Sequence, residues 1–253
     1  MDEAFLSFLE SEYASYVDSF RDGNGELPRM MQLKLDHTMH VVENAKAIME
    51  GERFDPLASL VGRAASLLHD TGRYEQLLKY NTFRDADSVD HAALSHDIVA
   101  KKGWLDGIPE RDAVLAAVRV HNMREIPAEV KDPLVLVASK VVRDADKLDI
   151  FRVLENEIAT SDWKTDCKAF WNLPVFADPG DTVVECIRKG TSVHYGEIKT
   201  LADFILVQVG WIRSELYFET TRKIAAERKH IEFRRDFLHE ISSSPAIDEL
   251  CSV

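Results

Sequence analysis

The sequence predicts an all-α protein, a helical bundle with additional helices in its C-terminal part. Apolar residues recur at a helical period along almost the whole chain. The chain has only 11 glycines and 8 prolines among 253 residues. Because globular proteins usually hold roughly 12% of these two residues, this scarcity favours long helices over many short strands. No internal repeat and no linker-like change in composition is present, so the simplest interpretation is one domain over residues 1–253.

The first two predicted helices come before residue 72. The first covers residues 33–49, where apolar residues and one histidine share a face at a spacing of about four. The second covers residues 57–70 and is expected to stop at Gly72, since glycine is the usual residue just after a helix. Residues 73–86 are polar and are expected to form a loop.

Three more helices are expected beyond this loop. The third is capped by Asp87 or Ser88 and runs to about Lys102. The fourth follows Pro109, and the fifth begins near Pro133. Each carries a stripe of apolar residues that can face a common core.

The C-terminal part is expected to be less regular. Residues 172–196 hold prolines and glycines close together, which predicts an irregular stretch. One or two more helices are expected over about residues 197–240, packed on the same core. Their apolar faces could be buried within the chain or against a second copy, so a homo-oligomer stays open.

Charge and cysteine content limit the partners and the compartment. The net charge of −13 disfavours binding to a nucleic-acid polymer, whose backbone is also negative. No run of about 18 apolar residues is present, so no membrane partner is expected. The three cysteines, Cys167, Cys186 and Cys251, are too far apart to indicate a disulfide framework or a metal-type pair. We therefore expect a cytoplasmic protein.

Histidines and aspartates gather on or beside the predicted inward faces of five consecutive helices. They are His37, the adjacent pair His69 and Asp70, His91, His121 and Asp146. Each histidine alone could be an ordinary core or cap residue. The two carboxylates fit that interpretation poorly, because a buried charge needs a partner. One divalent cation would serve several of these groups at once.

Imidazoles and carboxylates without a thiolate suit Fe, Mn, Co, Ni or Zn. His69 and Asp70 project about 100° apart if both are helical. Either both reach one ion or Asp70 bridges two, so the spacing leaves one or two ions open. The remaining histidines are expected to be structural or exposed, with His230 on a solvated helix face.

Four segments resemble the HD-domain metal-dependent phosphohydrolase superfamily. They are DHTMHVVENA, LLHDTGRYEQ, TFRDADSVDHA and VRDADKLD. The resemblance covers about residues 30–152 and implies an all-α HD-domain helical bundle around a central metal site.

The family pattern implies which residues would bind metal. His37, His69, Asp70 and Asp146 match the four family ligands. Asp146 is preferred over Asp144 and Asp149 because the family places its aspartate in a segment like ADKLD. His91 and His121 resemble the two additional histidines of members that bind two metals.

The resemblance also implies hydrolysis of a phosphate ester in a small phosphorylated substrate, such as a nucleotide, by a metal-activated water. Asp70 would orient the water and Arg73 would contact a phosphate oxygen, although a solvated helix-end arginine is the alternative. The segment HNMREIP, which begins at His121, lacks the second histidine and the Gly-Tyr-Pro signature of the cyclic-di-GMP phosphodiesterases. Two other functions stay open: a di-iron oxygenase of the same fold, and a non-catalytic metal-binding sensor or interaction module.

Overall fold

The computed structural model describes residues 1–165 and 170–252, and these residues form helices and no strand. The all-α prediction is therefore confirmed. The chain divides into two compact units, Met1–Asp149 and Ile150–Val253, and each is described by itself. The expectation of a single domain stays a prediction.

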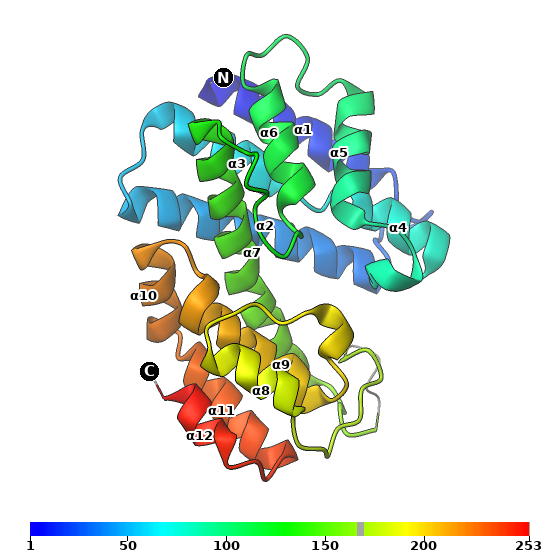
Figure 1. Cartoon of the computed structure of the whole chain (residues 1–253). Coiled ribbons are helices and arrows are strands. Elements are labelled where there is room, and N and C mark those ends of the chain that lie inside the picture. Colours follow the sequence, from blue (N-terminus) through cyan, green and yellow to red (C-terminus); the bar gives the residue numbers. More distant parts are fainter. Residues whose placement is uncertain (166–169, 253) are drawn as a thin grey trace. The chain divides into compact units, whose positions relative to one another are not determined.

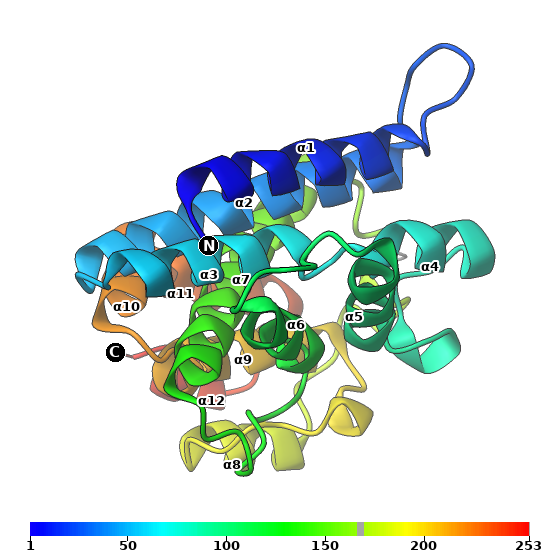
Figure 2. The ribbon, with the colours of Figure 1, turned by 90° about the horizontal axis from the view of Figure 1, so that it is seen from above.

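The first unit, whose helices Figure 1 shows, contains one helix that is largely buried, Pro56–Leu68. Its elements are α1 (Glu3–Asp18), α2 (Arg29–Gly51), α3 (Pro56–Leu68), α4 (Gly72–Tyr80), the 3-10 turn η1 (Asp85–Asp87), α5 (His91–Lys102), α6 (Arg111–Val120) and the first part of α7 (Pro133–Thr160). Nine of the 13 residues of α3 are buried, as expected of a helix that neighbours surround. α3 packs against α1, α2 and α6 (Figure 2), while α5 packs against α4 and α6.

The prediction of a loop over residues 73–86 is wrong for its first half, which forms α4. Gly72 does not end a helix but begins this one. A Cβ on Gly72 would lie 2.7 Å from the backbone nitrogen of Ser95 and 2.8 Å from the carbonyl oxygen of His91. The glycine therefore permits the close approach of α4 to α5. The sequence did not predict α4 because most of its residues are polar, although Tyr74 and Gln76 are buried.

The predicted cap of α5 is also wrong by two or three residues. Asp87 lies in η1, and Asp90 caps the helix by accepting hydrogen bonds from the backbone of Ala92 at 3.0 Å and of Ala93 at 3.1 Å. The other end is as expected, since α5 stops at Gly103 with a left-handed φ of 68°.

The second unit contains more helix than the sequence predicted. After the end of α7 its elements are α8 (Asp181–Arg188), η3 (Tyr195–Glu197), α9 (Leu201–Gly210), the π-helical turn η4 (Trp211–Glu215), α10 (Glu219–Glu227), α11 (His230–Ile241) and α12 (Ala246–Cys251). α9 begins at a capping box in which Thr200 and Asp203 bind each other's backbone. α9 packs against α8 and α11, and α11 packs against α12.

Two expectations for this unit are corrected. The stretch 172–196 is not wholly irregular, because α8 forms between two flanking glycines, Gly180 and Gly190. His230 is not solvated but only 2% exposed; its Nδ1 lies 2.6 Å from a carboxylate oxygen of Glu155. Cys186 and Cys251 are free thiols, while Cys167 lies outside the described residues.

Candidate metal centre

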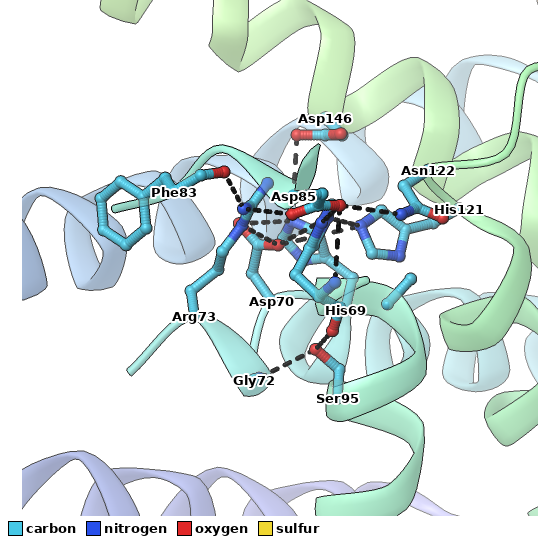
Figure 3. Close-up of polar contacts among 12 residues, drawn as sticks. His69, Asp70, Gly72, Arg73, Phe83, Asp85, Ser95, His121, Asn122 and Asp146 are labelled. Atoms are coloured by element: carbon cyan, nitrogen blue, oxygen red, sulfur yellow. Dashed lines mark hydrogen bonds and ion pairs between the residues drawn. The ribbon is translucent and has the colours of Figure 1, made fainter. Parts of the chain in front are cut away.

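The six histidines and aspartates singled out in the sequence lie together inside the first unit. Figure 3 shows His69, Asp70, His121 and Asp146 at this site. His37 comes from α2, the adjacent His69 and Asp70 from the turn after α3, His91 from the start of α5, His121 from the end of α6 and Asp146 from α7. All are buried except Asp146, whose side chain is 19% exposed.

One oxygen of Asp70 faces a first group of ligand atoms. Its Oδ2 lies 3.6 Å from Nε2 of His37 and 3.7 Å from Nε2 of His69. Asp146 closes this group, with Oδ1 at 3.1 Å from Nε2 of His37 and 3.8 Å from Nε2 of His69. Asp146 thus lies with this group, and its choice as the ligand of its segment stays a prediction.

The other oxygen of Asp70 faces a second group. Its Oδ1 lies 3.5 Å from Nε2 of His91 and 3.8 Å from Nε2 of His121, and these two nitrogens are 3.1 Å apart. A single carboxylate thus stands between two sets of imidazole nitrogens. This is the arrangement that a bridging aspartate needs.

All four histidines are held by Nδ1, which leaves Nε2 to face the cluster. His69 and His121 each follow the last residue of a helix, and Nδ1 of each bonds to the carbonyl oxygen three residues earlier, at 2.7 and 2.8 Å. The other two are held by carboxylates: Nδ1 of His37 lies 2.6 Å from Asp149, and Nδ1 of His91 lies 2.6 Å from Asp85. An oxygen acceptor at Nδ1 fixes the proton there and leaves the Nε2 lone pair for a metal.

The charge states of the second group suit metal binding. Burial lowers the pKa of His91 and of His121 to about 4, with a further contribution from Arg73 for His91 and from His69 for His121. Both imidazoles are therefore neutral near pH 7 and can offer a lone pair. The pKa of His69 is also lowered, mainly by burial.

The first group contains the charged members. Burial acts to raise the pKa of Asp70, but Lys34, His69 and Arg73 hold it well below its usual range. Burial likewise acts against the ionised form of Asp146, yet the close contact with the ring of His37 and the charge of that ring lower its pKa. For His37, burial and Lys34 act to lower the pKa, and the two aspartates at its ring outweigh them and raise it.

Three buried atoms of the cluster fit a cation. Nε2 of His37, Nε2 of His69 and Oδ1 of Asp70 make no hydrogen bond within the part of the chain that the structure describes. Buried polar atoms without partners are costly and uncommon in native proteins. Since they belong to groups whose ligand atoms lie within 4.8 Å of one another, a divalent transition metal fits the donor set.

Arg73 is not the solvated helix-end arginine that was the alternative, because its side chain is only 13% exposed. Its Nη1 donates to the side chain of Gln76 at 2.8 Å, the carbonyl oxygen of Phe83 at 2.6 Å and Asp85 at 3.1 Å. Its Nε lies 3.4 Å from Oδ1 of Asp70. The guanidinium is therefore fixed beside the cluster, and its contact with a phosphate stays a prediction.

Three residues at the site were missed from the sequence. Asp85 and Asp149 hold histidine rings, and Nζ of Lys34 forms an ion pair with Oδ2 of Asp70 at 2.8 Å. Lys34 and Asp149 each lie three residues from a cluster member on the same helix, His37 and Asp146 respectively. That spacing places neighbours on one helix face and is the signal that could have found them.

The first unit is thus a helical domain with a buried histidine–aspartate cluster that could hold a metal ion. Residues 35–150 match the family profile of the HD domain, and all six cluster residues lie within that range. The chain thus contains an HD domain, which confirms the resemblance to the HD-domain metal-dependent phosphohydrolase superfamily. No curated protein and no solved structure matches the chain.

The described helices bear on the expectation that the protein has no membrane partner. Among the described residues, none of the helices combines the length and apolar character that crossing a bilayer requires.

Proposed function

We propose that this protein is a metal-dependent phosphohydrolase that cleaves a phosphate ester of a small molecule, such as a nucleotide. The observation that carries the proposal is the position of Asp70 within the HD domain. Its two oxygens face two separate sets of imidazole nitrogens, at 3.5 to 3.8 Å. This geometry supports two cations sharing one carboxylate.

Each cluster residue has a role in the proposal. His37, His69 and Asp146 hold one cation and His91 and His121 hold the other, with Asp70 common to both. Bound divalent ions would lower the pKa of a water toward neutrality and offset the charge of the attacked phosphate. Asp70 orients the attacking water through its carboxylate, and the fixed guanidinium of Arg73 receives a phosphate oxygen.

The test begins with metal content. Protein purified without a metal-affinity tag is analysed for bound elements and then assayed for phosphate release on a panel of phosphate esters. His69→Ala and Asp70→Ala should abolish tight metal binding and phosphate release while most helicity remains. His40→Ala is the matched control, because His40 lies one turn after His37 on α2 and is exposed.

The same measurements separate the alternatives. Oxygen consumption by the iron-loaded protein, with no phosphate released from any ester, would favour the di-iron oxygenase, whose ligand type the four histidines also suit. Intact metal binding without turnover on the whole panel would favour a sensor or interaction module. Undiminished metal content in both variants would reject the assignment of the cluster.

A further inference from the structure

Lys34 is a basic residue that contacts the histidine–aspartate cluster directly. It lies on α2 one turn before His37, and its Nζ is 2.8 Å from Oδ2 of Asp70. This is the oxygen that faces His37 and His69. The side chain is 17% exposed, so part of it is open to solvent while its ammonium contacts the cluster.

Lys34 and Arg73 place two positive charges on the same carboxylate. Lys34 contacts Oδ2 of Asp70, while Nε of Arg73 lies 3.4 Å from Oδ1. Once Asp70 binds a divalent cation, its negative charge is shared with that cation. The two basic groups then lie beside further positive charge and are repelled unless an anion joins them.

The two basic groups differ in freedom of movement. Arg73 is fixed by three acceptors on one nitrogen. Among the described residues Lys34 makes a single hydrogen bond, to Asp70, so two of its three ammonium donors are available. The ring of Phe83 lies 5.3 Å from Nζ of Lys34 and 5.7 Å from Cζ of Arg73, so both basic groups lie against the same aromatic ring.

We propose that Lys34 is a substrate-binding residue that moves from Asp70 to a phosphate oxygen when metal and substrate are bound. With Arg73 it forms a cradle of two positive charges, which matches the two negative charges of a phosphate monoester. A phosphate diester carries only one. This inference rests on the proposed function and names its substrate class as phosphate monoesters.

The experiment uses Lys34→Met, which keeps the length of the side chain and removes its charge. Lys46→Met is the matched control, because Lys46 lies on the same helix and is exposed. Two affinities are measured by calorimetry for each protein: that of the metal-free protein for Mn²⁺, and that of the metal-loaded protein for inorganic phosphate. Dimethyl phosphate serves as the singly charged diester.

The two affinities should change in opposite directions. Lys34→Met should bind Mn²⁺ at least as tightly as the wild type, because a competing cation has left Asp70. Its affinity for inorganic phosphate should fall about 10- to 100-fold, the range for a hydrogen bond to a charged group. Lys34→Arg should retain most of this affinity, and Lys46→Met should match the wild type. The wild type should bind inorganic phosphate more tightly than dimethyl phosphate.

Other results overturn the inference. If Lys34→Met keeps its affinity for phosphate, or binds Mn²⁺ more weakly than the wild type, Lys34 is only a structural partner of Asp70. The proposed function still stands in that case, provided that the wild type releases phosphate. Equal affinity for phosphate and dimethyl phosphate removes the monoester preference. A metal-loaded wild type that binds no phosphate and releases none from any ester overturns the proposed function and this inference together.

Discussion

The substitution Asp85→Asn should empty one half of the metal centre and leave the other filled. Asp85 is an acceptor on both oxygens. Oδ2 lies 2.6 Å from Nδ1 of His91 and 3.4 Å from the amide nitrogen of Asn122. Oδ1 accepts from Arg73 at 3.1 Å and from Gln76 at 2.9 Å. Figure 3 shows this carboxylate lying between Arg73 and Asn122.

An asparagine cannot replace this carboxylate in either orientation. Its amide group would meet donors from His91 on one side or from Arg73 and Gln76 on the other. Burial acts to raise the pKa of Asp85, but the hydrogen bond and charge of His91 dominate and lower it to about 2. The native group is therefore a carboxylate at neutral pH, and the substitution removes its charge.

The expected effect on metal binding is large and confined to one ion. Loss of the carboxylate that orients a ligand histidine typically weakens metal affinity about 10- to 100-fold. We expect this loss for the ion held by His91 and His121, while the ion held by His37, His69 and Asp146 binds as in the wild type. Titration with Co²⁺, followed by absorbance and by elemental analysis, resolves the two ions.

Asp87→Asn is the matched control, since Asp87 lies in the same 3-10 turn, has a side chain that is 54% exposed and pairs with Arg84. It should bind both ions normally. The reasoning is refuted if Asp85→Asn binds two ions with wild-type affinities, because the hydrogen bond to His91 would then have no effect on ligation.

Three further predictions follow from the geometry. Gly72→Ala should destabilise the first unit by about 1–3 kcal/mol, because the new Cβ meets two backbone atoms of α5; thermal unfolding equal to that of Gly23→Ala, whose Cβ meets nothing within 4 Å, would contradict this. His91→Ala and His121→Ala should each retain one of two bound metal ions by elemental analysis, and wild-type stoichiometry in both would argue against the second ion. Burial acts to raise the pKa of Glu155, but the imidazole and guanidinium of α11 lower it. Its stabilisation is therefore present above the usual carboxyl pKa and lost as the pH falls through the lowered pKa. Glu155→Gln should be less stable than the wild type at pH 7, and urea unfolding should show the difference shrinking toward acidic pH; a pH-independent difference would refute the assignment.

The sequence predicted a helix best where one face is apolar and needs only an apolar surface to pack against. α2 is of this kind, since its period marks the buried face. α4 was missed because the role of Gly72 depends on the backbone of α5, which local sequence does not reveal. α8 was missed because two glycines bound a helix of only eight residues.

Part of the candidate site could also be predicted from the sequence. The six cluster residues were found because they lie on or beside predicted inward helix faces and because all but His121 stand in segments that resemble the HD domain. The structure brings the six together, and their role as ligands stays a prediction. Asp85 was missed because it lies in a stretch expected to be a loop, and its contact with His91 depends on how η1 leads into α5. His230 was misplaced because it follows Arg228 and Lys229 in the sequence, which indicates exposure, whereas its ring is buried and its Nδ1 contacts Glu155 on α7.

The four Nδ1 anchors also determine when the imidazole rings become ordered. Each ring is immobilised by folding, before any cation arrives, so binding does not carry the cost of about 0.5–1.5 kcal/mol for each side chain that must be ordered. The neutral state of His91 and His121 near pH 7 means that no proton has to leave these two rings either. Metal binding should therefore leave the conformation of this domain nearly unchanged, with nearly the same helix content before and after loading.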